Sequence, residues 1–143
     1  MSKSTSRRQF LETSLKAALT VPFLTSGLLS CDAPENKKLN ILILGGTSFL
    51  GPHQIAYALG RGHSVSIFTR GKTQPTVHKE LFDQVEQLVG DRNDNLKALE
   101  NRQWDAVIDN SGRQAEWTKK TAELLKDNCG LYLYTSSTGV YYP

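Results

Sequence analysis

A glycine-rich segment at residues 45–51 has the composition and spacing of an anion-binding turn. It follows an apolar run at 39–44 and precedes residues with helical spacing, so a strand must turn sharply into a helix there. Glycine permits both the turn and the close approach of a phosphate to backbone amides, and the positive end of a helix favours negative charge. We therefore expect a diphosphate to be bound by Gly45, Gly46, Thr47, Ser48, Phe49, Leu50 and Gly51. The alternative is a tight structural turn without a ligand. A Walker phosphate loop is excluded because no Gly-Lys-Ser/Thr sequence follows.

Five short apolar runs are the elements that must position this turn. They lie at 39–44, 65–68, 85–89, 106–109 and 131–134. A continuous apolar run such as the first indicates a strand that is buried on both faces, as in a parallel sheet. Helical spacing is found at 52–59 and 117–125 and, more briefly, at 96–99, whereas 73–80 has little periodicity. This alternation predicts an open α/β sheet with helices on both faces.

The segment Leu44–Gly51 resembles the opening of the extended short-chain dehydrogenase/reductase family, the NAD-dependent epimerase/dehydratase group, whose pattern is Gly-x-x-Gly-x-x-Gly. Gly45 and Gly51 match this pattern, and Ser48 replaces the middle glycine by another small residue. The resemblance covers about residues 39–142. It implies a Rossmann-type doubly wound parallel sheet of about five strands over residues 39–143, incomplete at the C-terminus, with NAD or NADP as cofactor.

The end of the second strand bears on the choice between the two cofactors. Many NAD-binding members of the family have an acidic residue here that accepts hydrogen bonds from the ribose hydroxyls. This chain has Thr69 at the corresponding place, followed by Arg70 and Lys72. A guanidinium can bind a 2′-phosphate in bidentate fashion. We therefore expect a preference for NADP over NAD. The alternative for Arg70 is a solvated loop charge.

The resemblance extends to the ends of the third and fourth strands. The segment Gly90–Arg92 resembles the family's third-strand end, where the aspartate meets the adenine, which makes Asp91 and Arg92 candidate cofactor contacts. A turn aspartate that caps the next helix is an equal alternative for Asp91. The segment Asp109–Gly112 ends the fourth strand and is expected to pass near the cofactor's ribose, because its small residues suit a close approach. Asn110 and Ser111 are the candidate contacts in this segment.

A cluster of hydroxyl side chains follows the fifth strand. The segment Tyr134–Tyr141 resembles the end of the family's fifth strand, where a Ser or Thr holds the substrate's reacting oxygen. The resemblance assigns this catalytic role to Ser137, with Ser136 second, and the alternative is a local turn hydrogen bond. The family's acid–base pair is a Tyr-x-x-x-Lys further along the chain, and this sequence contains no such pair.

We interpret the chain as the NAD(P)-binding portion of an epimerase-, dehydratase- or reductase-like enzyme. The resemblance implies nicotinamide hydride transfer on a sugar-like or small carbonyl substrate. Two alternatives stay open, a non-catalytic dinucleotide-binding module and an inactive fragment, because Tyr-x-x-x-Lys is missing.

The first 30 residues are predicted to be an export signal. Ser6–Leu11 resembles the twin-arginine signal, a mildly apolar stretch follows at 15–29, and Leu28–Cys31 resembles the lipobox of bacterial lipoproteins. These resemblances imply export of the folded protein, acylation of Cys31 and a periplasmic or other extracytoplasmic location at a membrane. Polar residues 31–38 are expected to form a tether. The alternative is an ordinary amphipathic N-terminal helix.

The charge distribution does not favour a nucleic-acid partner. The net charge is +3, and the first 30 residues hold four basic and one acidic side chain, so residues 31–143 are formally neutral. No Cys-x-x-Cys pattern indicates a metal or redox site. We therefore expect a dinucleotide and a small molecule as partners.

Overall fold

The five apolar runs form strands in the computed structural model, which describes residues 37–136. The strands are β1 (Asn40–Leu44), β2 (Ser64–Thr69), β3 (Glu86–Val89), β4 (Trp104–Asp109) and β5 (Cys129–Tyr134). Each lies at or within two residues of its predicted run. The predicted export signal, Cys31 and the candidate catalytic residue Ser137 lie outside the described residues.

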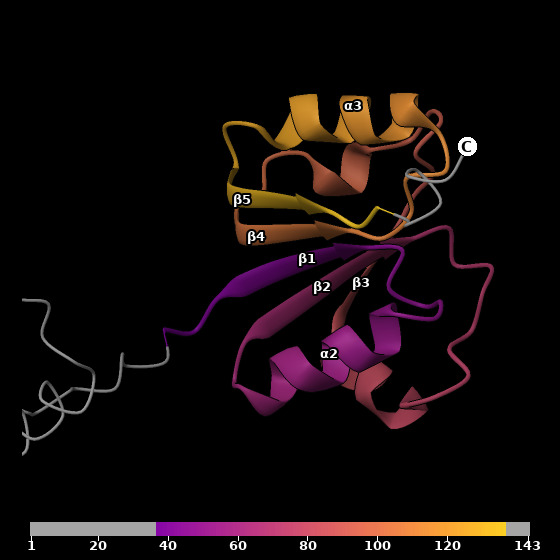
Figure 1. The fold of residues 1–143 in the computed structure, drawn as a ribbon, viewed down its shortest axis with the longest axis vertical. Coiled ribbons are helices and arrows are strands. Elements are labelled where there is room, and N and C mark those ends of the chain that lie inside the picture. Colours follow the sequence, from indigo (N-terminus) through magenta and orange to yellow (C-terminus); the bar gives the residue numbers. More distant parts are fainter. Residues whose placement is uncertain (1–36, 137–143) are drawn as a thin grey trace, which may run out of the picture. The chain divides into compact units, whose positions relative to one another are not determined.

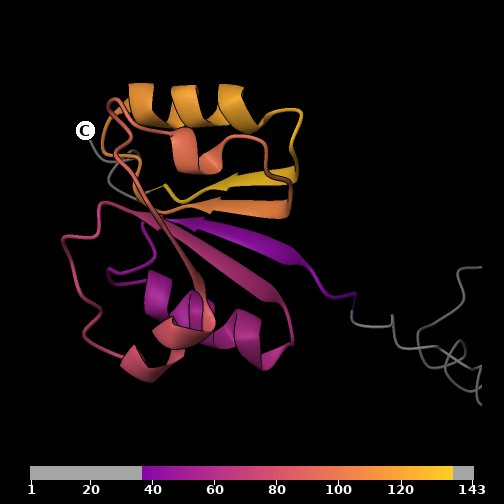
Figure 2. The ribbon, with the colours of Figure 1, turned by 180° about the vertical axis from the view of Figure 1, so that it is seen from behind.

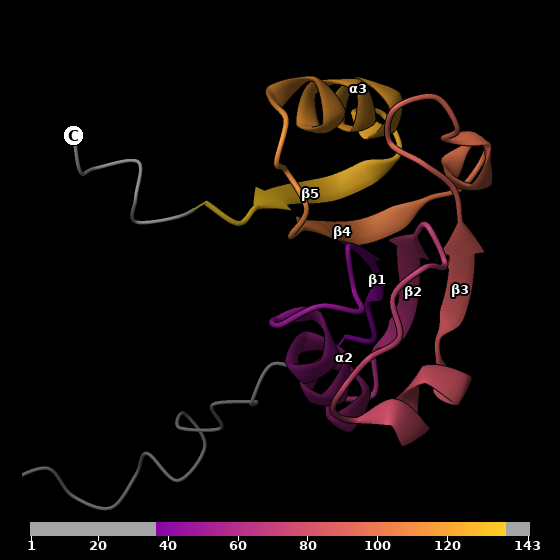
Figure 3. The same cartoon turned by 90° about the vertical axis from the view of Figure 1, so that its right-hand side faces the viewer.

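All neighbouring strands are parallel, and their order across the sheet is β3-β2-β1-β4-β5 (Figure 3). The central strand is β1, in which Leu42, Ile43 and Leu44 have no exposed surface. A strand that is covered on both faces must be apolar throughout, which explains why its sequence does not alternate. The strand order reverses at β1, between β2 on one side and β4 on the other. The predicted Rossmann-type doubly wound sheet is therefore confirmed.

Helical elements cover both faces of the sheet (Figures 1 and 2). One face carries α2 (Gly51–Gly60) and the 3₁₀ helix η1 (Lys79–Gln84), and the other carries α3 (Ala115–Leu125) and the short 3₁₀ helix η2 (Lys97–Leu99). Successive side chains of β1 point to opposite faces of the sheet, as the pleat of a strand requires. Ile41 and Ile43 belong to the core cluster on the α2 face, and Leu42 and Leu44 to the cluster on the α3 face.

The boundaries of α2 follow from its sequence. Pro52 lies in the first turn, where its missing N–H removes no helical hydrogen bond, and Ile55 and Ala58 are buried. The helix ends at Gly60, and Gly62 follows with φ +79°. The aperiodic region at 73–80 consists of a loop and the first two residues of η1. A 3₁₀ helix has about three residues per turn, so its sequence shows no 3.6-residue period.

The edges of the described sheet are β3 and β5 (Figure 3). Apolar side chains are exposed on both, Val89 on β3 and Leu131 and Leu133 on β5. Neither helix in the described part of the chain has the length and apolar character needed to cross a membrane. In open parallel sheets, ligands bind beyond the carboxyl ends of the strands where the strand order reverses, so the ends of β1 and β4 are the place to look for a site.

Candidate functional site

The turn between β1 and α2 has the geometry that its glycines predict. Gly45 has φ +83°, and a Cβ there would lie 2.8 Å from the Cβ of Ser111, so both the backbone and the neighbouring loop require glycine. A Cβ on Gly51 would overlap the backbone carbonyl of Gly46. These contacts let α2 begin directly against the end of β1. The first turn of α2 has no acidic residue, and the N-cap residue, Leu50, provides no side-chain cap, which leaves the helix N-terminus open to an anion.

A cavity of about 410 Å³ lies at the carboxyl ends of the strands. The glycine turn, the segments after β2, β3 and β4, and the start of α3 supply its lining residues: Gly45, Thr47, Ser48, Phe49, Leu50, Phe68, Thr69, Arg70, Lys72, Thr73, Gly90, Asp91, Arg92, Asn110, Ser111, Arg113 and Trp117. Its size lies within the range of small-molecule and cofactor sites.

Ten of the twelve residues predicted to bind a cofactor line this cavity. The other two, Gly46 and Gly51, lie behind the turn and form its backbone contact. In the turn, the non-glycine residue with positive φ is Phe49, at +32°, so serine at position 48 causes no comparable strain. Phe49 is 88% exposed and therefore lies at the rim. The structure brings the predicted set together, and its contact with a cofactor stays a prediction.

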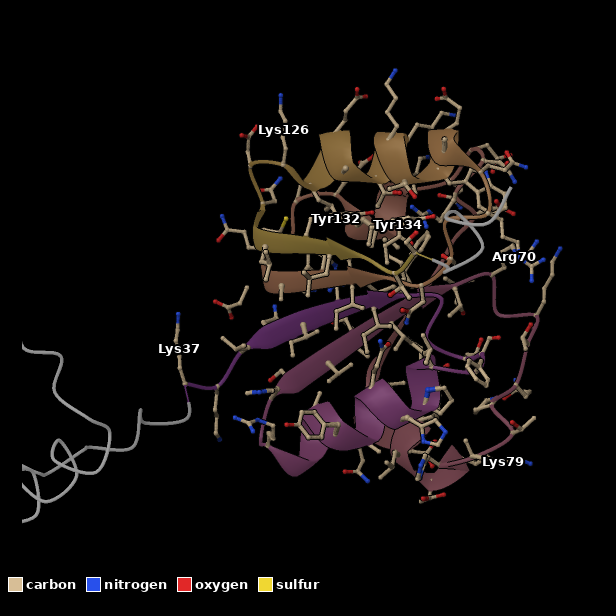
Figure 4. The ribbon with its side chains drawn as sticks, viewed as in Figure 1. Lys37, Arg70, Lys79, Lys126, Tyr132 and Tyr134 are labelled. Carbon is tan, nitrogen blue, oxygen red and sulfur yellow. The ribbon has the colours of Figure 1, made fainter. Side chains whose placement is uncertain are left out.

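Basic side chains dominate one part of the cavity lining. Arg70, Lys72 and Arg113 are exposed there, and Figure 4 shows Arg70 extending outward from the segment after β2. The carboxylate of Asp91 lies among them and accepts hydrogen bonds from the backbone and side chain of Asn93. These bonds lower the pKa of Asp91 against the effect of desolvation, and the charges of Arg70 and Lys72 lower it further. The cavity therefore has a positive balance that favours an anionic ligand.

The guanidinium of Arg92 is held by protein side chains. Its Nη1 and Nη2 donate to the two carboxylate oxygens of Asp109 over 2.6 and 2.8 Å. Nη1 also donates to Oγ of Ser111 over 3.0 Å, while Nε and Nη2 donate to Oγ1 of Thr121 over 3.2 and 3.1 Å. Arg92 lines the cavity although it is only 6% exposed. All three nitrogens have protein partners, and a contact of Arg92 with a cofactor stays a prediction.

Asp109 is a buried charged residue that sequence reasoning did not select for the site. It also accepts hydrogen bonds from the backbone amide of Ser111, from Oγ1 of Thr118 and from Oη of Tyr132, over 3.1, 3.1 and 2.8 Å. Burial raises the pKa of Asp109, but the hydrogen bonds and charge of Arg92 outweigh burial and hold the pKa below its usual value. The signal that could have identified Asp109 is a carboxylate at the end of an otherwise apolar strand, because a buried charge needs a partner.

Asn110 joins three elements beside the cavity. Its Nδ2 donates to Oε1 of Gln54 in α2 over 2.6 Å, and its Oδ1 accepts from Oγ1 of Thr135, after β5, over 2.8 Å. The backbone amide of Thr135 also donates to the carbonyl of Asp109 over 2.9 Å. The ends of β4 and β5 are therefore fixed relative to the start of α2.

The segment predicted to carry catalysis leaves β5 beside these contacts. Oη of Tyr134 donates to the backbone carbonyl of Gly112 over 3.1 Å, and Tyr132 and Tyr134 both lie on the strand beneath α3 (Figure 4). Ser136 is exposed at the end of the described chain. The catalytic role of Ser137 stays a prediction. Among residues 37–136 there is no group of three or more His, Cys, Asp or Glu side chains that could hold a metal ion.

Sequence comparison matches this chain to a family and to a longer relative. The model of the NAD dependent epimerase/dehydratase family matches residues 41–138. The chloroplast stem-loop binding protein of 41 kDa b from Arabidopsis thaliana is 36% identical over 129 residues, which cover 80% of this chain. The chain spans 33% of the length of that relative.

Solved structures share the fold at low sequence identity. AtPrR2 in its apo form superposes with a TM-score of 0.56 at 20% identity, over 69% of this chain and 38% of that chain. The reductase domain of the aureusimine biosynthetic cluster superposes with a TM-score of 0.54 at 21% identity, over 71% of this chain and 33% of that chain. The Bordetella bronchiseptica enzyme WbmG in complex with NAD superposes with a TM-score of 0.56 at 17% identity, over 71% of this chain and 38% of that chain.

Proposed function

Because the chain belongs to the NAD dependent epimerase/dehydratase family, we propose that its cavity binds a nicotinamide dinucleotide. The observation that carries the proposal is an uncapped helix N-terminus opening onto a basic cavity at the reversal of strand order. The presence of NAD in the WbmG complex, which has the same fold, supports the choice of ligand.

The diphosphate is proposed to lie against residues 45–50. The partial positive charge of the α2 N-terminus and backbone amides of the turn would bind the phosphate oxygens. Thr47 and Ser48 both line the cavity and bring hydroxyl groups to the same place, so each can donate one further hydrogen bond.

The segment after β2 is proposed to select NADP over NAD. Thr69 carries no charge to repel a 2′-phosphate, and Arg70 and Lys72 line the cavity next to it. Charge-assisted hydrogen bonds from these two side chains would contribute about 1.5–3 kcal/mol each. Asp91 opposes this preference, but its carboxylate is engaged by Asn93.

The whole protein is proposed to be an epimerase, dehydratase or reductase that acts on a sugar-like or small carbonyl substrate. The nicotinamide, when bound, accepts or supplies a hydride. Ser137 is proposed to hold the substrate's reacting oxygen by a hydrogen bond. The path from Tyr134 to Ser136, which is tied to β4 through Thr135, supports this placement.

Calorimetric titration with NADPH and NADH tests the proposal. Wild-type protein should bind NADPH more tightly. Arg70→Ala should weaken NADPH binding by about tenfold or more, since the lost contact is charge-assisted, and should leave NADH binding unchanged. Lys126→Ala, which removes a positive charge far from the cavity (Figure 4), should change neither affinity. Folded protein without affinity for either nucleotide would refute the cofactor proposal, and equal losses for both would refute the role of Arg70.

A second candidate function is non-catalytic binding, which the name of the Arabidopsis relative favours. That protein is described as stem-loop binding, and its likeness to this chain extends beyond the fold to 36% identity. Residues 31–143 are formally neutral, so binding of a nucleic-acid hairpin would depend on a local basic surface such as the cavity rim. Hairpin binding that NADPH displaces would support this candidate.

A further inference from the structure

The ion pair between Arg92 and Asp109 differs from the other ion pairs of residues 37–136 in its burial. Its two side chains are 7% and 0% exposed, whereas both partners of the Arg102–Glu86 pair are at least 40% exposed. The pair also joins separate elements, because Arg92 follows β3 and Asp109 ends β4. Arg92 lines the cavity, and its guanidinium also donates to Thr121 of α3.

Stability alone does not account for such a pair. The desolvation of two charges largely offsets their attraction, and buried pairs can often be replaced by apolar residues without loss of stability. Two hydrogen bonds of the pair are directed at the segment after β4. Ser111 is held twice, through its hydroxyl by Arg92 and through its backbone amide by Asp109.

Ser111 transmits this constraint to the glycine turn. Its Cβ is the atom that a Cβ on Gly45 would meet at 2.8 Å, so the serine packs directly against the turn. Ser111 lines the cavity next to that turn, and Arg113 lines it as well. The pair therefore fixes how the segment after β4 packs against the glycine turn.

We propose that Arg92 and Asp109 are positioning residues that hold residues 110–113 in the nucleotide-binding geometry before the ligand arrives. This inference rests on the proposed function. If residues 110–113 are already ordered in the free protein, binding does not have to supply the free energy of ordering them. The affinity then depends on the fraction of molecules in the competent geometry. If removal of the pair lowers that fraction to about a tenth, the apparent Kd rises about tenfold.

The test replaces both charges in the full chain with Arg92→Met and Asp109→Leu together. The thermal midpoint should fall, because Tyr132, Thr118 and Thr121 lose hydrogen-bond partners, but the variant should still fold because no lone charge is left buried. The Kd for NADPH should rise about tenfold, and the amide hydrogen of Ser111 should exchange faster in the free protein. The matched control is Arg102→Met with Glu86→Leu, a more exposed pair away from the cavity, which should change neither quantity.

Arg92→Lys keeps the test decisive if the double variant fails to fold. Lysine retains the charge beside Asp109 but lacks the planar fork that reaches Asp109, Ser111 and Thr121 together, so faster exchange and weaker NADPH binding are again expected. A folded variant with wild-type exchange and affinity would overturn the inference. Wild-type protein that binds no nucleotide would overturn the proposed function, and the exchange measurement would then decide whether the pair orders residues 110–113.

Discussion

Alanine substitutions at the two ends of α2 should have opposite effects. A Cβ at Gly51 would overlap the carbonyl of Gly46, so the two backbones would have to separate by about 1.3 Å to reach ordinary contact. Forcing atoms into a packed site costs about 1–3 kcal/mol, and we expect the upper end because both partners are backbone. A Cβ at Gly60 would meet nothing within 4 Å, so alanine there should stabilise the helix by about 0.5–1 kcal/mol.

Circular dichroism during heating and urea titration measures both effects. For a domain of about 100 residues, a loss of 3 kcal/mol lowers the Tm by roughly 12–24 °C, whereas the gain at Gly60 raises it by roughly 2–8 °C. NADPH titration below the Tm adds a second readout. Gly51→Ala should weaken binding because the turn must move, and Gly60→Ala should leave the Kd unchanged.

Two results would refute this reasoning. One is a Gly51→Ala variant whose Tm lies within about 3 °C of wild type, since the predicted overlap would then be relieved at little cost. The other is Gly60→Ala destabilising the protein as much as Gly51→Ala. In that case the response would reflect helix composition and not the contact with Gly46.

Three further predictions concern the hydrogen bonds around Asp109 and the predicted lipid anchor at Cys31. Tyr132→Phe removes one hydrogen bond to Asp109 and should lower the free energy of unfolding by about 1–3 kcal/mol in urea titration, and an unchanged midpoint would contradict the bond. Because the pKa of Asp109 is lowered in the folded protein, the stability that it contributes is complete above its unfolded pKa of about 4 and is lost as the pH falls through the folded pKa. The free energy of unfolding, measured from pH 7 to pH 2, should therefore fall more steeply in acid for wild type than for the variant with both Arg92→Met and Asp109→Leu. Cys31→Ala should abolish fatty-acid labelling and membrane association in a bacterial host, Cys129→Ala should abolish neither, and labelling that survives Cys31→Ala would exclude the predicted anchor.

The central strand β1 could be predicted because a strand that is buried on both faces has a continuous apolar sequence. The run at 39–44 differs from β1 by a single residue, and the run at 131–134 ends where β5 ends. The start of β5 was less visible, because Gly130 interrupts the apolar pattern and Cys129 is in the strand through its pairing with Trp104. Register with a neighbour, which a local pattern does not contain, sets that boundary.

The candidate site was predictable where it depends on local turn chemistry and not where it depends on distant partners. The glycine turn could be located because strand, turn and helix are contiguous. Arg92 was selected for a cofactor, but its partner Asp109 is 17 residues away on another strand, and no local rule joins them. Arg113 and Trp117 reach the cavity only because α3 begins beside the loop after β3, where Nε1 of Trp117 donates to Asn93.

The central place of β1 also determines when this domain can fold during its synthesis. Ile41 pairs with Val65 on one side and with Ala106 on the other, and no neighbouring strands are joined by a hairpin. The ribosome therefore releases the most apolar strand first and its last partner about 65 residues later. Until then the nascent chain carries an apolar segment that a chaperone would have to protect, and a pause in translation before β4 would lengthen that exposure.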